Sequence, residues 1–295
     1  MKNAIMVLAN NMYFFELLVK NLPKTDLKDI QFIAINETRI GDKTDEIQKI
    51  YDKYNISERV KKASILTSRK IVDKFKKDVI DNSFVEEYCM STKNLAHWYG
   101  IKYLKLDKMF VSDEDVIFRD GFSKVFESDH NMFMHIRLSA GPSHVSDLSD
   151  NAKRYYREFC RIFGYKLTES FWTNKYLKNY ESAGNKLIVA AEEDIADYEK
   201  MMKAFYESEV LYEFWTNRRV HTSWGLDEKF ETFYFINRSN KELRKYVHLI
   251  LSAPEKFAPN YHNTLKKYAY LHNATRGRKP EVYEYMIKNG VIEGI

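Results

Sequence analysis

The sequence has few of the features that mark a membrane, secreted or disulfide-stabilised protein. It holds only two cysteines, Cys89 and Cys160, and they lack the C-x-x-C spacing of many metal and redox sites. No apolar run approaches the roughly 18 residues that a membrane span needs. The start of the chain is broken by Asn10, Asn11 and Glu16 and lacks a small-residue cleavage site, unlike a signal peptide. We therefore expect a soluble, cytoplasmic protein with reduced thiols.

Linkers, internal repeats and low-complexity tracts are also missing from the chain. With 295 residues, 44% of them hydrophobic, the chain can build either one large domain or two small ones. Because no Ser/Gly-rich stretch separates two parts, we expect a single domain over residues 1–295.

The charge balance is only mildly basic. A net charge of +5 and a pI of about 8.8 suit nucleic acid, anionic sugars or nucleotide phosphates as partners. The pI lies below the value of about 9 that would make nucleic acid the leading partner. The 21 tyrosines suit either stacking on rings and bases or a half-buried surface. Composition therefore leaves the partner open.

Hydrophobic patterning in the first half predicts strands that alternate with helices. The apolar runs at 3–9 and 30–36 predict strands, and the segment 13–22 between them predicts a helix. Charged segments with helical spacing follow at 44–55 and 68–82, residues 83–107 are mostly helical, and 109–113 predicts a strand. This order is typical of an α/β fold with a central mixed, mostly parallel sheet flanked by helices.

The second half gives a weaker pattern. We expect a strand at 131–139, a loop at 140–151, a helix at 152–167, a turn, a strand and a helix start at 180–194, and more helix at 195–219. The tail that follows is polar and basic, and Pro254 and Pro259 predict irregular structure there.

Three acids interrupt an apolar segment in "FVSDEDVIF" (110–118), namely Asp113, Glu114 and Asp115. Burying an unpaired charge is costly, so these acids need either basic partners or a metal ion. Ligands gather at the carboxyl ends of strands in such sheets. Asp113 and Asp115 would point to opposite faces of a continuing strand, so both can bind one ion only if the strand ends or turns there. A structural, solvated acidic cluster is the other interpretation.

These features resemble a known enzyme class. The β-α-β opening, a basic residue on the helix before the acidic strand, and "FVSDEDVIF" resemble the nucleotide-sugar half of GT-A glycosyltransferases. The late "HNATRGRKPE" (272–281) has His272, Gly277, Lys279 and Pro280 in the order of the His-x-x-Gly-x-x-Lys-Pro motif, with altered spacing. That motif marks family 8, the group of glycogenin and bacterial lipopolysaccharide galactosyltransferases.

The resemblance implies a single GT-A type domain. Residues 1–120 would form the nucleotide-sugar-binding half, and 121–295 the acceptor-binding half with a C-terminal metal and diphosphate segment. The donor would be a nucleotide sugar, with UDP-sugar favoured. Asp113, Asp115 and His272 would hold Mn²⁺ or Mg²⁺, which prefer carboxylate oxygens, an imidazole also suiting Mn²⁺.

The resemblance also implies residues that contact the donor. Asp113 and Lys93 would lie near the sugar and diphosphate, and Lys279, with Gly277 and the neighbouring Arg276 and Arg278, would bind the diphosphate. The base and ribose would meet Ala9, Asn10 and Tyr13, and Gly184 in "SAG" would meet the donor sugar. The plainer interpretations are that Asn10 is a helix cap, Lys93 a surface lysine, "SAG" a tight turn, and 276–279 a solvated basic segment.

A second acidic pair, Asp227 and Glu228, opens an apparent helix after Gly225. By the resemblance one of them would be the general base of an inverting enzyme, or would position the sugar in a retaining one. Acids are also favoured in a first helical turn by the helix dipole alone.

The predicted function is transfer of a sugar to an acceptor hydroxyl on a glycan, a protein or a hydroxymethylated DNA base, the last as in phage DNA-modifying glycosyltransferases. One alternative is a non-catalytic nucleic-acid-binding protein with structural acids. Another is a metal-dependent nucleotidyltransferase or nuclease, which also uses paired aspartates. No Gly-rich phosphate loop or added acidic cluster favours that last class.

Overall fold

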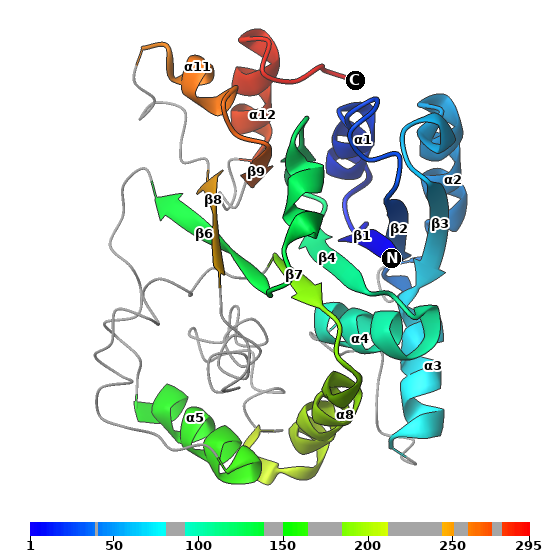
Figure 1. Cartoon of the computed structure of the whole chain (residues 1–295), viewed down its shortest axis with the longest axis vertical. Coiled ribbons are helices and arrows are strands. Elements are labelled where there is room, and N and C mark those ends of the chain that lie inside the picture. Colours follow the sequence, from blue (N-terminus) through cyan, green and yellow to red (C-terminus); the bar gives the residue numbers. More distant parts are fainter. Residues whose placement is uncertain are drawn as a thin grey trace.

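The computed structural model describes residues 1–38, 41–80, 92–138, 150–164, 185–211, 244–250, 259–272 and 279–295. In these ranges the chain forms an α/β fold with one mixed sheet flanked by helices (Figure 1), as the patterning predicts. The first part contains β1 (Asn3–Leu8), α1 (Met12–Lys20), β2 (Gln31–Asn36), α2 (Thr44–Lys53), β3 (Lys62–Thr67) and α3 (Ser68–Asp78).

The middle and last parts complete the sheet. The middle part contains α4 (Thr92–Tyr99), a π-helix (Gly100–Leu104), β4 (Lys108–Asp113), β5 (Val116–Phe118), a 3-10 helix (Phe122–Glu127), β6 (Met132–Leu138) and α5 (Asp150–Phe163). The last part contains β7 (Lys186–Val189), α8 (Glu192–Glu207), β8 (Arg244–Ile250), α11 (Tyr261–Leu265), β9 (Tyr270–His272) and α12 (Lys279–Lys288). None of the helices in the described ranges is long and apolar enough to cross a membrane.

The nine strands within the described ranges lie in the order β3-β2-β1-β4-β7-β6-β8-β9-β5. Strands β3, β2, β1 and β4 pair in parallel, as do β6, β8 and β9. Antiparallel pairs join β7 to its two neighbours and β5 to β9. The parallel strands β1 and β4 therefore end at the same edge of the sheet, where Leu8 lies opposite Asp113.

Both faces of the first four strands are covered by helices. Ala4, Met6 and Leu8 pack in a core with α3, α4 and α8, whereas Ile5 and Val7 pack in a second core with α1 and α2. Figure 1 shows these two sets of helices on opposite sides of β1 to β4. Because a strand buried on both faces needs apolar side chains at every position, β1 is a continuous apolar run.

A third core ties the end of the chain to its beginning. Phe14 of α1, Ile117 of β5, Leu271 of β9 and Tyr283 of α12 are buried together. The rings of Phe14 and Tyr283 are stacked with centroids 5.1 Å apart. This core holds β9 beside β5, and the position of the sheet's last two strands follows from it.

The structure corrects the sequence interpretation of the tail. Sequence analysis names no strand or helix in the tail, yet the tail contains β8, α11, β9 and α12. Pro259 lies in a turn, as expected, and Pro254 lies outside the described residues. Strand β3 was also missed, because this edge strand buries only Leu66 and so shows no apolar run. The helix expected at 68–82 ends at Asp78, and the one at 44–55 ends at Lys53.

Candidate metal and nucleotide-sugar site

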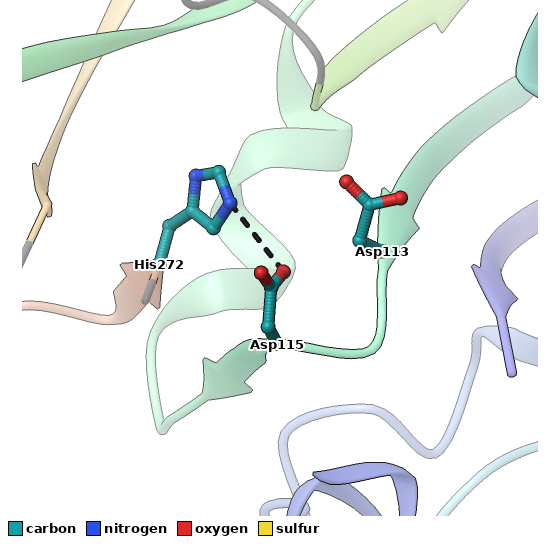
Figure 2. Close-up of side chains that lie close together, drawn as sticks. All are labelled: Asp113, Asp115 and His272. Carbon is teal, nitrogen blue, oxygen red and sulfur yellow. Dashed lines mark ion pairs between the residues drawn. The ribbon is translucent and has the colours of Figure 1, made fainter. Parts of the chain in front are cut away.

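The two aspartates lie on either side of a turn. Asp113 is the last residue of β4, and Asp115 directly precedes β5. The strand therefore ends between them, which is the condition for both carboxylates to face one ion. Figure 2 shows the two side chains on the same side of this turn.

Strand β9 brings a histidine to the same place. The antiparallel pairing of β5 with β9 sets His272 opposite Val116, the residue after Asp115. The His272 Nε2 atom lies 3.4 Å from Asp115 Oδ1 (Figure 2). One ligand atom from each of Asp113, Asp115 and His272 lies within 4.8 Å of the other two. The structure thus brings together the three residues that the sequence singles out as metal ligands.

The chemistry of this group fits a divalent cation. Asp115 is only 4% exposed and His272 is also buried, so the carboxylate and imidazole are held away from bulk water. Carboxylate oxygens suit Mg²⁺ and Mn²⁺, and an imidazole in the set is tolerated by Mn²⁺. Buried carboxylates this close together are favoured by a positive charge between them. The group could therefore hold a divalent cation.

Lys93 supplies a second counter-charge. Its Nζ lies 2.6 Å from Asp113 Oδ2, and it reaches the site from α4. The side chain is buried, so the interpretation of Lys93 as a surface lysine is wrong. An ammonium this close to the aspartate lies where it could also meet an anionic group of a ligand. The acidic turn thus has a basic partner as well as a metal-binding geometry.

Glu114, the middle acid, has a different role from its neighbours. It is buried, and its Oε1 accepts a hydrogen bond of 3.0 Å from the backbone N–H of Asn11. Burial, together with the charge of Asp113, raises the pKa of this carboxyl to about 7. Sequence reasoning missed this contact because its partner lies about 100 positions away.

The residues after β1 lie at the same edge of the sheet. Ala9 is buried, Tyr13 is 47% exposed, and the backbone carbonyl of Asn10 accepts a hydrogen bond of 2.5 Å from Lys43 Nζ. The buried Asn10 Oδ1 has no hydrogen-bond partner among the described residues. The interpretation of Asn10 as a helix cap is wrong, because Asn11 caps α1 through bonds from its Oδ1 to the next turn.

Two further buried residues lie near the turn, and one of them hydrogen-bonds to it. Asn185, just before β7, accepts a 3.3 Å hydrogen bond from the Asp113 backbone N–H through its Oδ1. Tyr283 of α12 is fully buried, and its hydroxyl has no hydrogen-bond partner among the described residues. Burial, together with the charges of Asp115 and Glu114, raises the pKa of this phenol well above its usual value. No short-range sequence signal identifies either residue.

Several predicted site residues cannot be placed. Gly184, Asp227, Glu228, Gly277 and the arginines at 276 and 278 lie outside the described residues. Lys279 is the first residue of α12, and the position of its side chain is not described. Their roles remain predictions.

Comparisons with known proteins give structural similarity only. The sequence matches no model of a protein family and no curated protein. Mouse xyloside xylosyltransferase 1, in its apo form, is similar over 92% of this chain and 97% of its own, with 11% identity and a TM-score of 0.41. The galactosyltransferase LgtC, in complex with donor and acceptor sugar analogs, is similar over 99% and 97%, with 10% identity and a TM-score of 0.47.

The bifunctional glycosyltransferase WbbM, in its apo form, has 8% identity and a TM-score of 0.49 over 96% of this chain. The chain spans about half of WbbM, 51% of its length. All three structures are glycosyltransferases, the class that the sequence resembles. At these TM-scores the overlaps carry no weight for function, so the side chains of the site must carry it.

Proposed function

We propose that the protein is a metal-dependent glycosyltransferase that takes a nucleotide sugar, with UDP-sugar favoured, and transfers the sugar to an acceptor hydroxyl. The observation that carries this proposal is the Asp113, Asp115 and His272 group at the carboxyl end of β4. Ligands of α/β folds bind at this edge of the sheet. The basic Lys93 beside the group suits a donor that carries phosphate charge.

Each of these side chains has a distinct part in the proposal. Asp113, Asp115 and His272 would hold Mn²⁺ or Mg²⁺, which, when bound, supplies Lewis-acid stabilisation of the leaving diphosphate. Lys93 holds the Asp113 carboxylate in place and is positioned to donate a hydrogen bond to a diphosphate or sugar oxygen. The buried Leu8 of β1 and Ser112 of β4 limit the access of water beside Asp113.

The base and ribose of the donor would meet Ala9, Asn10 and Tyr13. The buried Asn10 Oδ1 can accept a hydrogen bond from a base N–H or a ribose hydroxyl. The exposed Tyr13 ring can stack on a base. These residues directly follow β1, whose end lies beside Asp113, so base and diphosphate would span neighbouring strands.

The remaining roles come from the resemblance. Lys279 and Gly277 would bind the diphosphate and Gly184 the donor sugar. Asp227 or Glu228 would act at the acceptor hydroxyl, as a general base or by positioning the sugar. Residues 1–120 and 121–295 would be the donor and acceptor halves of one domain.

The test is a screen of nucleotide sugars by thermal shift and donor hydrolysis, with and without Mn²⁺. We expect one donor to stabilise the protein and to be hydrolysed slowly only with metal, and the Asp113→Ala, Asp115→Ala double variant to lose both effects. Asp129→Ala is a matched control, because this aspartate is 90% exposed and pairs with Lys108 at 3.3 Å, outside the metal group.

Failure to respond to any nucleotide sugar or nucleoside diphosphate under any metal condition would refute the proposal. Consumption of a nucleoside triphosphate or cleavage of nucleic acid would instead support the nucleotidyltransferase or nuclease alternative. Once a donor is found, a gel shift with DNA across a salt series tests the acceptor, because binding through phosphate contacts falls steeply with salt. A glycan or protein acceptor predicts no such shift.

A further inference from the structure

Glu114 joins two parts of the site that are far apart in the sequence. It lies in the metal-binding turn between Asp113 and Asp115 and accepts the 3.0 Å hydrogen bond from the Asn11 N–H. Asn11 is the N-cap residue of α1. Its Oδ1 accepts hydrogen bonds of 3.0 Å from the Tyr13 N–H and 3.3 Å from the Phe14 N–H. A chain of hydrogen bonds therefore runs from the turn into the first turn of α1.

We define the α1 start as residues 9–14. This segment includes the residues proposed to receive the base and ribose of the donor, and it lies beside the metal-binding turn. Within it, Asn10 contributes its carbonyl to Lys43, and Phe14 packs on Tyr283. The direct strand pairing of β1 with β4 ends at Leu8 and Asp113. Beyond that pair, the Glu114 hydrogen bond connects the turn to the α1 start.

We infer that Glu114 is a positioning residue that couples the metal-binding turn to the α1 start, so that occupation of the turn orders the segment that receives the donor's base and ribose. This role rests on the proposed function. It requires a buried hydrogen-bond acceptor at the end of a side chain as long as that of glutamate, and it does not require a negative charge. Glu114 would not itself be a metal ligand, because its Oε1 is turned to the Asn11 N–H.

Acceptor and charge can be separated by substitution. Glu114→Gln keeps the length and a carbonyl oxygen in the position of Oε1, whereas Glu114→Ala removes the acceptor and leaves a buried N–H without its partner. Asp194→Ala is a matched control. Asp194 is also a fully buried acid whose carboxylate accepts a backbone N–H at a helix start, that of Ala191 at 2.9 Å, but it caps α8.

The experiment measures amide hydrogen exchange in peptides that cover 9–14, in each variant, with and without Mn²⁺ alone, followed by the affinity for UDP in the presence of Mn²⁺. In the wild type and Glu114→Gln, we expect Mn²⁺ to slow exchange of the α1 start several-fold. In Glu114→Ala we expect exchange to be about tenfold faster and insensitive to Mn²⁺, with UDP binding at least fivefold weaker. Asp194→Ala should lose stability but keep the wild-type response.

Two results would overturn the inference. One is an α1 start that still responds to Mn²⁺ in Glu114→Ala, and the other is a Glu114→Gln protein as defective as Glu114→Ala, which would assign the effect to charge. If the wild type binds no Mn²⁺ or UDP, the proposed function fails. In that case, amide exchange of the α1 start without metal still tests whether Glu114 orders this segment. Exchange in Glu114→Ala that equals the wild-type exchange would refute the positioning role separately from the proposed function.

Discussion

The ion pair between Lys93 and Asp113 makes a prediction about metal and stability together. Lys93→Met removes the ammonium while keeping a side chain of similar length in the core around α4. The Nζ to Oδ2 distance is 2.6 Å, and the two side chains are 8% and 33% exposed. Breaking a fully buried pair costs about 3–5 kcal/mol, and an exposed pair is worth about 0–1 kcal/mol. With one partner one-third exposed, we expect a loss of about 2 kcal/mol in metal-free protein.

Mn²⁺ should then reduce this loss. Removing a positive charge next to Asp113 favours a cation, because two unit charges about 4 Å apart interact by about 4 kcal/mol at an effective dielectric constant of about 20, before screening by solvent. We expect the variant to bind Mn²⁺ about tenfold more tightly than the wild type. At a metal concentration of about 100 times the wild-type Kd, the wild type gains about 2.7 kcal/mol and the variant gains more.

The assay is urea denaturation with EDTA and with a series of Mn²⁺ concentrations. Lys102→Met is the control, because Lys102 forms a 2.8 Å ion pair with Glu199 in which both side chains are about a quarter exposed, away from the metal group. That variant should lose under about 1 kcal/mol at every metal concentration. A Lys93→Met protein as stable as the wild type in EDTA, or a loss that Mn²⁺ leaves unchanged, would refute the reasoning.

Two other measurements follow from buried side chains. Glu114 has a pKa raised from 4.5 to about 7, so its folded form holds a proton more tightly and its contribution to stability is lost as the pH rises from about 4.5 through 7. In urea denaturation with EDTA, the unfolding free energy of Glu114→Gln should therefore rise relative to that of the wild type between pH 5 and 8, by on the order of 3 kcal/mol. Curves of unfolding free energy against pH that run parallel for the two proteins would contradict this. Phe110→Ala should lose about 3–5 kcal/mol of unfolding free energy, because the fully buried ring packs on those of Phe118, Phe122 and Tyr270. A loss below about 1 kcal/mol would show that this aromatic cluster collapses around the cavity.

The parts of the fold that the sequence predicts are those with strong local signals. Strand β1 is a continuous apolar run because both of its faces are buried, and α1 has one buried stripe. The β-α-β opening can therefore be predicted from the hydrophobic pattern. The acidic turn can be predicted from the sequence because acids between two apolar segments have few structural explanations. Lys93 and His272 were identified through the resemblance, and both lie close to the aspartates, while their roles stay predictions.

The remaining parts depend on contacts between distant segments. Strand β9 has three residues and is defined by its pairing with β5 and β8, so nothing local marks it. The roles of Glu114 and Asn185 depend on bonds to Asn11 and to Asp113 across long stretches of chain. The cap of α1 was missed by one residue, because Asn10 and Asn11 are equally good caps by type and only the backbone decides between them.

The pairing of β5 with β9 also determines when the candidate metal site can form during folding. Asp115 and His272 are 157 positions apart, and their contact closes a loop that contains most of the second half of the chain. Contacts between such distant segments form late, after local structure is in place. On the ribosome, a chain made as far as β5 would still hold only the two aspartates. In the proposed function, full metal affinity would therefore arise late in folding, and the time course of Mn²⁺ binding during refolding would report when β9 docks.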